Sequence, residues 1–174
     1  MLKYNIERKL VENTSVRVWP RLFEQVIDFF LENHMMEDMV HGGEIIRDGR
    51  ACKEMRVDFM TKDTCIETKA PLSAWLPKGK TGYSRPSDLV VLMRFKDRFN
   101  VLRRHFSRVI LLIILPAGGI EQTERECLFS WLREAYRREI HGGMEIWTAD
   151  LELQEDGIVL VDYHNESIAI GGRQ

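Results

Sequence analysis

The stretch MRVDFMTKDTCIETK, residues 55–69, carries two six-residue segments rich in apolar and β-branched residues on either side of the polar turn Lys62-Asp63. Such segments, joined by a short polar turn, predict a β-hairpin, here with strands over residues 55–60 and 64–69. Side chains two positions apart share a face of a strand, so Glu67 and Lys69 are expected to point the same way. The hairpin thereby sets an acid beside an amine.

Pairing of the two strands adds a second acid to this place. Asp58 lies in the first strand and can sit beside Glu67 once the strands pair around the turn. Hydrolysis of a phosphodiester needs Mg²⁺ or Mn²⁺ to neutralise developing charge and to acidify the attacking water, and these hard cations take carboxylate oxygens. The carbonyl of Thr68 can complete the protein ligands, while Lys69 positions or deprotonates the water. The pattern predicts a metal-dependent phosphodiesterase with Asp58, Glu67 and Lys69 as catalytic residues.

A plainer interpretation of the same residues exists. Glu-x-Lys strings are common on solvent-exposed strands, where alternating charge keeps a sheet edge soluble. The context favours catalysis, because Asp58 precedes the string by one hairpin and Glu24, on a predicted helix, is expected at the same end. A non-catalytic nucleic-acid-binding or regulatory protein of the same fold, and a purely structural protein, stay open as alternatives.

The remainder of the chain predicts helices around a sheet. The apolar run 109–115 is typical of a strand buried on both faces in the middle of a sheet. The other expected elements are a helix over 15–35 with Pro20 in its first turn, a strand over 44–47, a loop over 71–86, a helix capped by Ser87 or Asp88, a helix over 122–138 with Trp131 on its apolar stripe, and strands over 144–153 and 158–163. This order predicts an α/β fold in which helices flank a mixed β-sheet.

Length and composition narrow the class of protein. A chain of 174 residues suits one core, so a single domain over residues 13–174 after an N-terminal extension of residues 1–12 is expected. The apolar runs are shorter than the ~20 residues of a membrane helix, and no signal-peptide pattern opens the chain, so a cytoplasmic protein is expected. The three cysteines lack ligand or framework spacing and should be reduced, and the five histidines show no metal-binding spacing.

Basic side chains gather between residues 78 and 104, although the net charge is only −2. Basic residues in a loop or on a helix are usually solvated surface residues. The alternative interpretation is that they contact the phosphates of a nucleic acid. The candidates for nucleic-acid binding are Lys78, Lys80, Arg85, Arg94, Lys96 and Arg98.

Two segments of the hairpin resemble a known active-site core. Met55-Arg-Val-Asp-Phe59 and Cys65-Ile-Glu-Thr-Lys69 are similar to the D…ExK core of the PD-(D/E)xK nuclease superfamily, with Val57 in place of the leading proline. More narrowly, residues 13–163 resemble the C-terminal domain of the sugar fermentation stimulation protein A (SfsA) family. The segments that carry the narrower resemblance are Asn13-Thr14 before a helix with Leu22 and Glu24, the strand Val109 to Leu115, Trp131-Leu-Arg-Glu-Ala135 and Gly143-Met-Glu-Ile146.

The resemblance implies a restriction-endonuclease-like fold and cleavage or binding of DNA or RNA with Mg²⁺ or Mn²⁺. It places Asp58, Glu67 and Lys69 in the site, with Glu24 as an auxiliary acid at the metal. A basic residue on the helix after the ExK strand often approaches the scissile phosphate in this superfamily, which singles out Arg94 and Arg98. The chain departs from the family in lacking room before Asn13 for an OB-type domain and in its longer, more basic segment 70–83. A homodimer is left open.

Overall fold

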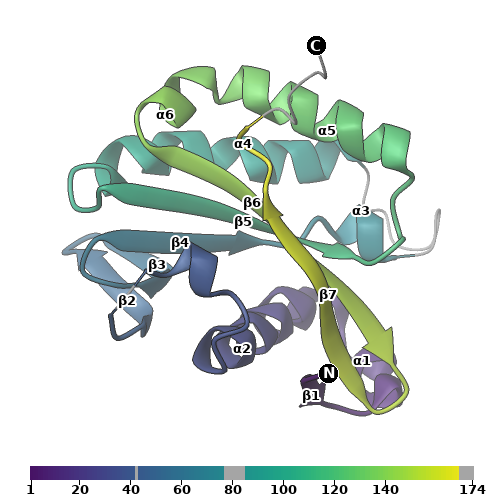
Figure 1. Ribbon diagram of the computed structural model, residues 1–174. Helices are drawn as coiled ribbons and strands as arrows, with labels where there is room; N and C mark the ends of the chain where they lie inside the picture. The colour runs from purple at the N-terminus through teal and green to yellow at the C-terminus, as the bar shows by residue number, and fades with distance from the viewer. Residues whose placement is uncertain (42, 77–84, 169–174) are drawn as a thin grey trace.

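The computed structural model describes residues 1–41, 43–76 and 85–168. The described residues form one seven-stranded mixed sheet in the order β1-β7-β6-β5-β4-β3-β2. Figure 1 shows α4, α5 and α6 over one face of this curled sheet and α2 over the other. The strands are β1 Lys3–Asn5, β2 Ile46–Cys52, β3 Met55–Met60, β4 Thr64–Lys69, β5 Arg108–Pro116, β6 Met144–Gln154 and β7 Gly157–Asn165. The predicted α/β class with a mixed sheet between helices is confirmed.

The helices differ widely in length. The α-helices are α1 Arg8–Asn13, α2 Trp19–Glu32, α3 Leu72–Trp75, α4 Arg85–Leu102, α5 Gln122–Ala135 and α6 Arg137–His141, and two 3₁₀ turns are η1 Val16–Val18 and η2 Glu37–Met39. Pro20 lies in the first turn of α2, as predicted, where its missing N–H costs no hydrogen bond.

The central strand β5 divides the core in two. It pairs in parallel with β4 on one side and β6 on the other, and every side chain from Val109 to Leu115 is buried. Alternate residues face opposite sides: Ile110 packs with the core under α2, and Leu111 with the core under α4 and α5. The predicted double-sided burial of this strand is confirmed.

Several predicted boundaries were wrong. The strand expected over 44–47 runs from Ile46 to Cys52, and the loop expected over 71–86 contains helix α3. Helix α4 begins at Arg85, so Asp88 lies inside its first turn and accepts a hydrogen bond from the Ser73 N–H at 3.0 Å in place of capping the helix. Trp131, expected on the apolar stripe, is 41% exposed because α5 presents Phe129 and Leu132 to the core.

The N-terminal residues belong to this fold. β1 pairs antiparallel with β7, and Val11 is buried in the core under α2, where its carbonyl accepts a hydrogen bond from the Trp19 indole. The segment expected as an extension therefore supplies an edge strand. Cys52, Cys65 and Cys127 are free thiols, as predicted. Among the helices of the described residues, none has the length and apolar character needed to cross a membrane.

Candidate active site

Strands β3 and β4 separate at the place where the acids lie. Their ladder pairs Met60 with Cys65 and Phe59 with Ile66 and goes no further, although both strands continue. Asp58 enters the opening: its Oδ2 accepts hydrogen bonds from the Thr68 N–H at 2.7 Å and the Thr68 hydroxyl at 2.8 Å. The N–H and C=O of one strand residue point to the same edge, so the Thr68 carbonyl also faces this β3–β4 opening.

Glu67 and Lys69 meet at the same opening. The Lys69 ammonium donates to Glu67 Oε1 at 2.9 Å and to the Thr68 carbonyl at 3.0 Å. Arg98, on α4, approaches the same Glu67 Oε1 at 2.9 Å and donates to the Arg56 carbonyl. The structure therefore gathers the three predicted catalytic residues around Thr68: Asp58 contacts its N–H and hydroxyl, and Lys69 contacts both its carbonyl and Glu67, which Arg98 also contacts.

The Glu67 carboxylate is buried and only half satisfied. Its side chain is 3% exposed, both cations contact Oε1, and Oε2 is enclosed without a hydrogen-bond partner in the described part of the chain. Burial raises the pKa of Glu67, and the Asp58 charge adds to this, while Lys69 and Arg98 act in the opposite direction. A buried acceptor without a partner is costly, so the position suits a cation that would contact the free oxygen.

A cavity of about 170 Å³ borders Asp58 on the α2 side of the sheet. Four of its eight lining residues are acids and two are arginines: the lining residues are Arg21, Glu24, Gln25, Asp28, Arg47, Asp48, Asp58 and Phe59. Burial raises the pKa of Glu24 to about 7, with further contributions from the negative charges of Asp58 and Asp48. Glu24 thus lies at the end of the sheet where the sequence predicted an auxiliary acid.

Asp48 is a site residue that the sequence analysis missed. It lies opposite Asp58 at a break in the β2–β3 ladder and has a left-handed backbone, with φ of 48°. Asp tolerates this conformation better than most residues do. The pair Asp48-Gly49 is a common turn signal that follows the strand predicted over 44–47 and lies inside the observed strand β2, and it could have located this break.

The raised pKa of Glu24 predicts a pH-dependent stability. The folded protein binds this proton more tightly than the unfolded chain, so stabilisation by the proton is lost as the pH rises from the ordinary value of 4.5 to about 7. Glu24→Gln keeps the side chain neutral and is expected to raise the thermal midpoint at pH 8 and to leave it nearly unchanged at pH 4.5. Thermal unfolding at both pH values checks this, with the exposed Glu54→Gln as control; an equal shift at both pH values contradicts it.

Most of the other basic candidates lie away from the opening. Lys78 and Lys80 fall outside the described residues, Arg85 begins α4, and Arg94 is exposed on that helix. The Lys96 ammonium donates to the Ala135 carbonyl at 2.8 Å and lies 3.7 Å from Glu139, where α4 meets the end of α5. Of the candidates whose side chains the structure describes, Arg94, Lys96 and Arg98, only Arg98 contacts a predicted catalytic residue.

The residues at the opening fit a divalent cation in part. The described residues contain no group of three or more Asp, Glu, His or Cys side chains arranged to hold a metal ion. A site here would instead combine the carboxylates of Asp58 and Glu67 with the Thr68 carbonyl. The Lys69 ammonium already contacts two of these three groups, and the free Oε2 of Glu67 leaves an acceptor for a cation. Oxygen ligands of this kind suit Mg²⁺ and Mn²⁺.

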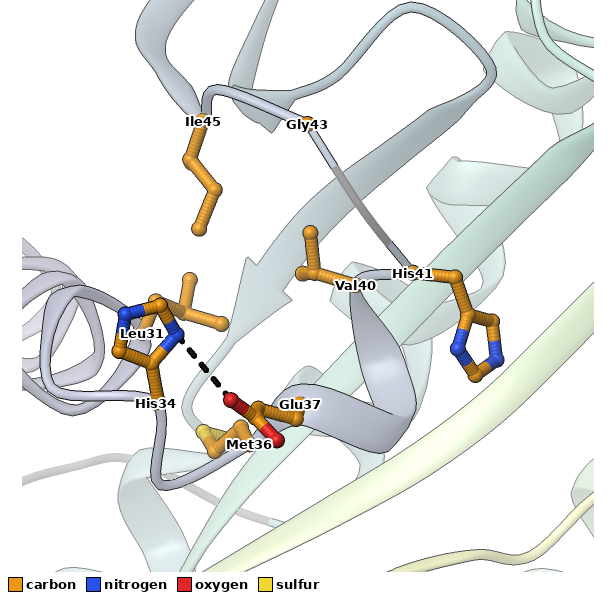
Figure 2. Close-up of a pocket in the computed structure, with 8 residues that line it drawn as sticks. All are labelled: Leu31, His34, Met36, Glu37, Val40, His41, Gly43 and Ile45. Carbon is orange, nitrogen blue, oxygen red and sulfur yellow. Dashed lines mark ion pairs between the residues drawn. The ribbon is translucent and has the colours of Figure 1, made fainter.

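A second, larger cavity of about 380 Å³ lies beyond the C-terminal end of α2. Figure 2 shows the His34 ring facing Glu37, with 3.3 Å between His34 Nδ1 and Glu37 Oε1, while the His41 ring lies apart. The other walls are apolar or glycine: Leu31, Met36, Val40, Gly43 and Ile45. This cavity has no counterpart to the paired carboxylates at the β3–β4 opening.

Comparison with known proteins shows the fold. No family model matches the chain, and no curated protein matches it. Among solved structures, the chain is similar to SfsA of Pyrococcus furiosus in complex with Ca²⁺, with a TM-score of 0.53 and 17% sequence identity over 82% of this chain. The matched region spans 63% of that SfsA chain. The protein therefore has an SfsA-like α/β fold, as the resemblance of its sequence implied.

Proposed function

We propose that the protein is a divalent-metal-dependent phosphodiesterase that cleaves DNA or RNA at the β3–β4 opening. The observation that supports this most is the buried Glu67 carboxylate, whose Oε2 has no partner among the described residues although Asp58, Thr68 and Lys69 surround the same opening. The Ca²⁺ bound by the similar SfsA structure adds support for a divalent cation, because Ca²⁺ also takes oxygen ligands.

Each residue has a separate role in this proposal. Asp58, Glu67 and the Thr68 carbonyl would hold Mg²⁺ or Mn²⁺, with Glu24 as an auxiliary acid. When bound, such an ion would neutralise charge on the phosphate and make the attacking water more acidic. The two hydrogen bonds from Thr68 fix the Asp58 carboxylate in the opening, so its orientation is set before a ligand arrives.

Lys69 acts on the reacting groups themselves. Its ammonium lies 3.0 Å from the Thr68 carbonyl, and its side chain is 25% exposed. A cation at this place can orient the attacking water and stabilise the negative charge that develops on the phosphoryl oxygens. Arg98 holds Glu67 from the α4 side and balances its charge.

A nucleic-acid-binding protein without turnover is the second candidate. The observation that favours it is the pair of cations on Glu67 Oε1, which already neutralises the carboxylate without a metal. In that case nucleic-acid binding should depend on salt, as phosphate contacts do, and should respond neither to divalent ions nor to Lys69→Ala.

Incubation of the purified protein with labelled single-stranded DNA, duplex DNA and RNA distinguishes the two candidates. Each substrate is tested with Mg²⁺, with Mn²⁺ and with a chelator. Cleavage that requires the ion and is lost in Asp58→Asn supports the phosphodiesterase. Binding without cleavage under every condition supports the second candidate.

A further inference from the structure

Two arginines face each other across the β2–β3 hairpin, and the described residues supply no counter-charge to either. Arg50 and Arg56 are direct partners in the antiparallel ladder, so their side chains share one face. Both are exposed, and neither guanidinium has a hydrogen bond or ion pair with any of the described residues. Like charges placed directly opposite each other destabilise a sheet, so this pair carries a cost that the fold itself does not relieve.

The next rung of the ladder shows which way the arginines point. Gly49 pairs with Val57, and Val57 is 1% exposed in the core beneath α4. Neighbouring rungs face opposite sides, so Arg50 and Arg56 project to the side of α2. That is the side on which Asp48 and Asp58 line the acidic cavity.

The two arginines also lie close along the strand to Asp58, one of the proposed metal ligands. Arg56 precedes Asp58 by two residues, which is about 6.6 Å along a strand. The Arg56 carbonyl accepts a hydrogen bond from Arg98, the residue that contacts Glu67, so the backbone of the pair is fixed relative to the opening. A polyanionic backbone with one phosphate at Asp58 and Glu67 would bring a neighbouring phosphate toward the arginines.

The geometry points to Arg50 and Arg56 as a phosphate-binding pair that holds the nucleic-acid backbone beside the cleaved bond. This inference rests on the proposed function and adds residues that the sequence analysis did not select. Each guanidinium offers a planar fork of donors that matches phosphate oxygens, and an anion between the two removes their mutual repulsion. Charges on an edge strand also prevent aggregation, but only Arg50 lies on the edge strand β2, whereas Arg56 lies on β3 inside the sheet.

Nucleic-acid binding by Arg50→Gln, Arg56→Gln and the double variant tests the pair. Fluorescence anisotropy with a labelled oligonucleotide in chelator measures binding apart from cleavage. Each substitution is expected to weaken binding of all sequences severalfold and to reduce the slope of log K against log salt by about 1. Arg104→Gln, an exposed arginine near the C-terminal end of α4, is the matched control and should leave both quantities unchanged. An unchanged slope in the double variant overturns the inference.

Arg50→Glu supplies a readout independent of binding. It converts the opposed like charges into an opposed ion pair, so the thermal midpoint at low salt should rise while oligonucleotide binding falls. A fall in both would assign the arginines a structural role and overturn the inference. If the protein binds nucleic acid but does not cleave it, the salt dependence of binding still tests the role of Arg50 and Arg56. If the protein cleaves nucleic acid and the double variant has an unchanged salt dependence, the role of the two arginines is refuted and the proposed function is not.

Discussion

Replacement of Glu67 by glutamine is expected to abolish metal-dependent cleavage of nucleic acid, with a loss on the order of 10³-fold. Glutamine keeps the shape of the side chain but removes the charge that would hold a divalent cation at the β3–β4 opening. An ion that neutralises charge in a phosphoryl transition state contributes several kcal/mol, and each ~1.4 kcal/mol corresponds to a factor of ten in rate. Single-turnover cleavage in Mn²⁺ measures the effect.

A matched control exists on the far side of α4. Glu139 is also buried, also lies near a lysine, Lys96 at 3.7 Å, and also has an Oε2 without a partner in the described residues. Glu139→Gln should therefore leave cleavage intact while making the same chemical change. The fold of Glu67→Gln should survive, because the glutamine oxygen can still accept hydrogen bonds from Lys69 and Arg98, whose side chains are 25% and 35% exposed and so remain in contact with solvent. Equal loss of cleavage in both variants, or none in Glu67→Gln, would refute the proposed role of Glu67.

The hairpin could be predicted from the sequence because its signal is local. The strands expected over 55–60 and 64–69 coincide with β3 and β4, since the strand-forming residues and the polar turn between them are recognised from neighbours in the chain. The central strand β5 was predictable for a related reason: a run of seven apolar residues suits burial on both faces.

The site depends on contacts that no local pattern encodes. The β3–β4 ladder ends at Phe59 and Ile66, and this early end admits the Asp58 carboxylate to the opening. The approach of Arg98 to Glu67 joins a helix and a strand 31 positions apart, which spacing alone does not reveal. Lys96 illustrates the reverse case: it lies on the same helix as Arg98, but its ammonium is held by the end of α5.

Tertiary packing also decided the elements that were missed. Helix α3 forms in a segment with loop composition because Trp75 packs its ring against Phe23 of α2, with 4.4 Å between ring centroids, and donates to the Ile114 carbonyl. The N-terminal strand β1 has only three residues and is defined by its pairing with β7. Neither partner is close in sequence, so propensity gave no indication of either element.

Lys69→Met is expected to change metal binding and turnover in opposite directions. The Lys69 ammonium lies 2.9 Å from Glu67 Oε1 and 3.0 Å from the Thr68 carbonyl, so it competes with a divalent cation for the same oxygens. Methionine retains the length of the side chain without its charge, so Mn²⁺ should bind more tightly at pH 8. Cleavage at saturating Mn²⁺ should nevertheless fall by roughly 10²–10⁴-fold, because the group that orients the water and stabilises the phosphoryl charge is gone.

Calorimetric titration with Mn²⁺ and single-turnover cleavage measure the two effects of Lys69→Met separately. A pH of 8 matters because Lys69 lowers the pKa of Glu67, and its loss raises that pKa further, so protons would compete with Mn²⁺ at lower pH. Lys96→Met is the matched control, since Lys96 likewise contacts a backbone carbonyl and a buried glutamate, but away from the opening. Weaker Mn²⁺ binding by Lys69→Met would show that this ammonium supports the metal site, and turnover that persists at saturating Mn²⁺ would remove Lys69 from the chemistry.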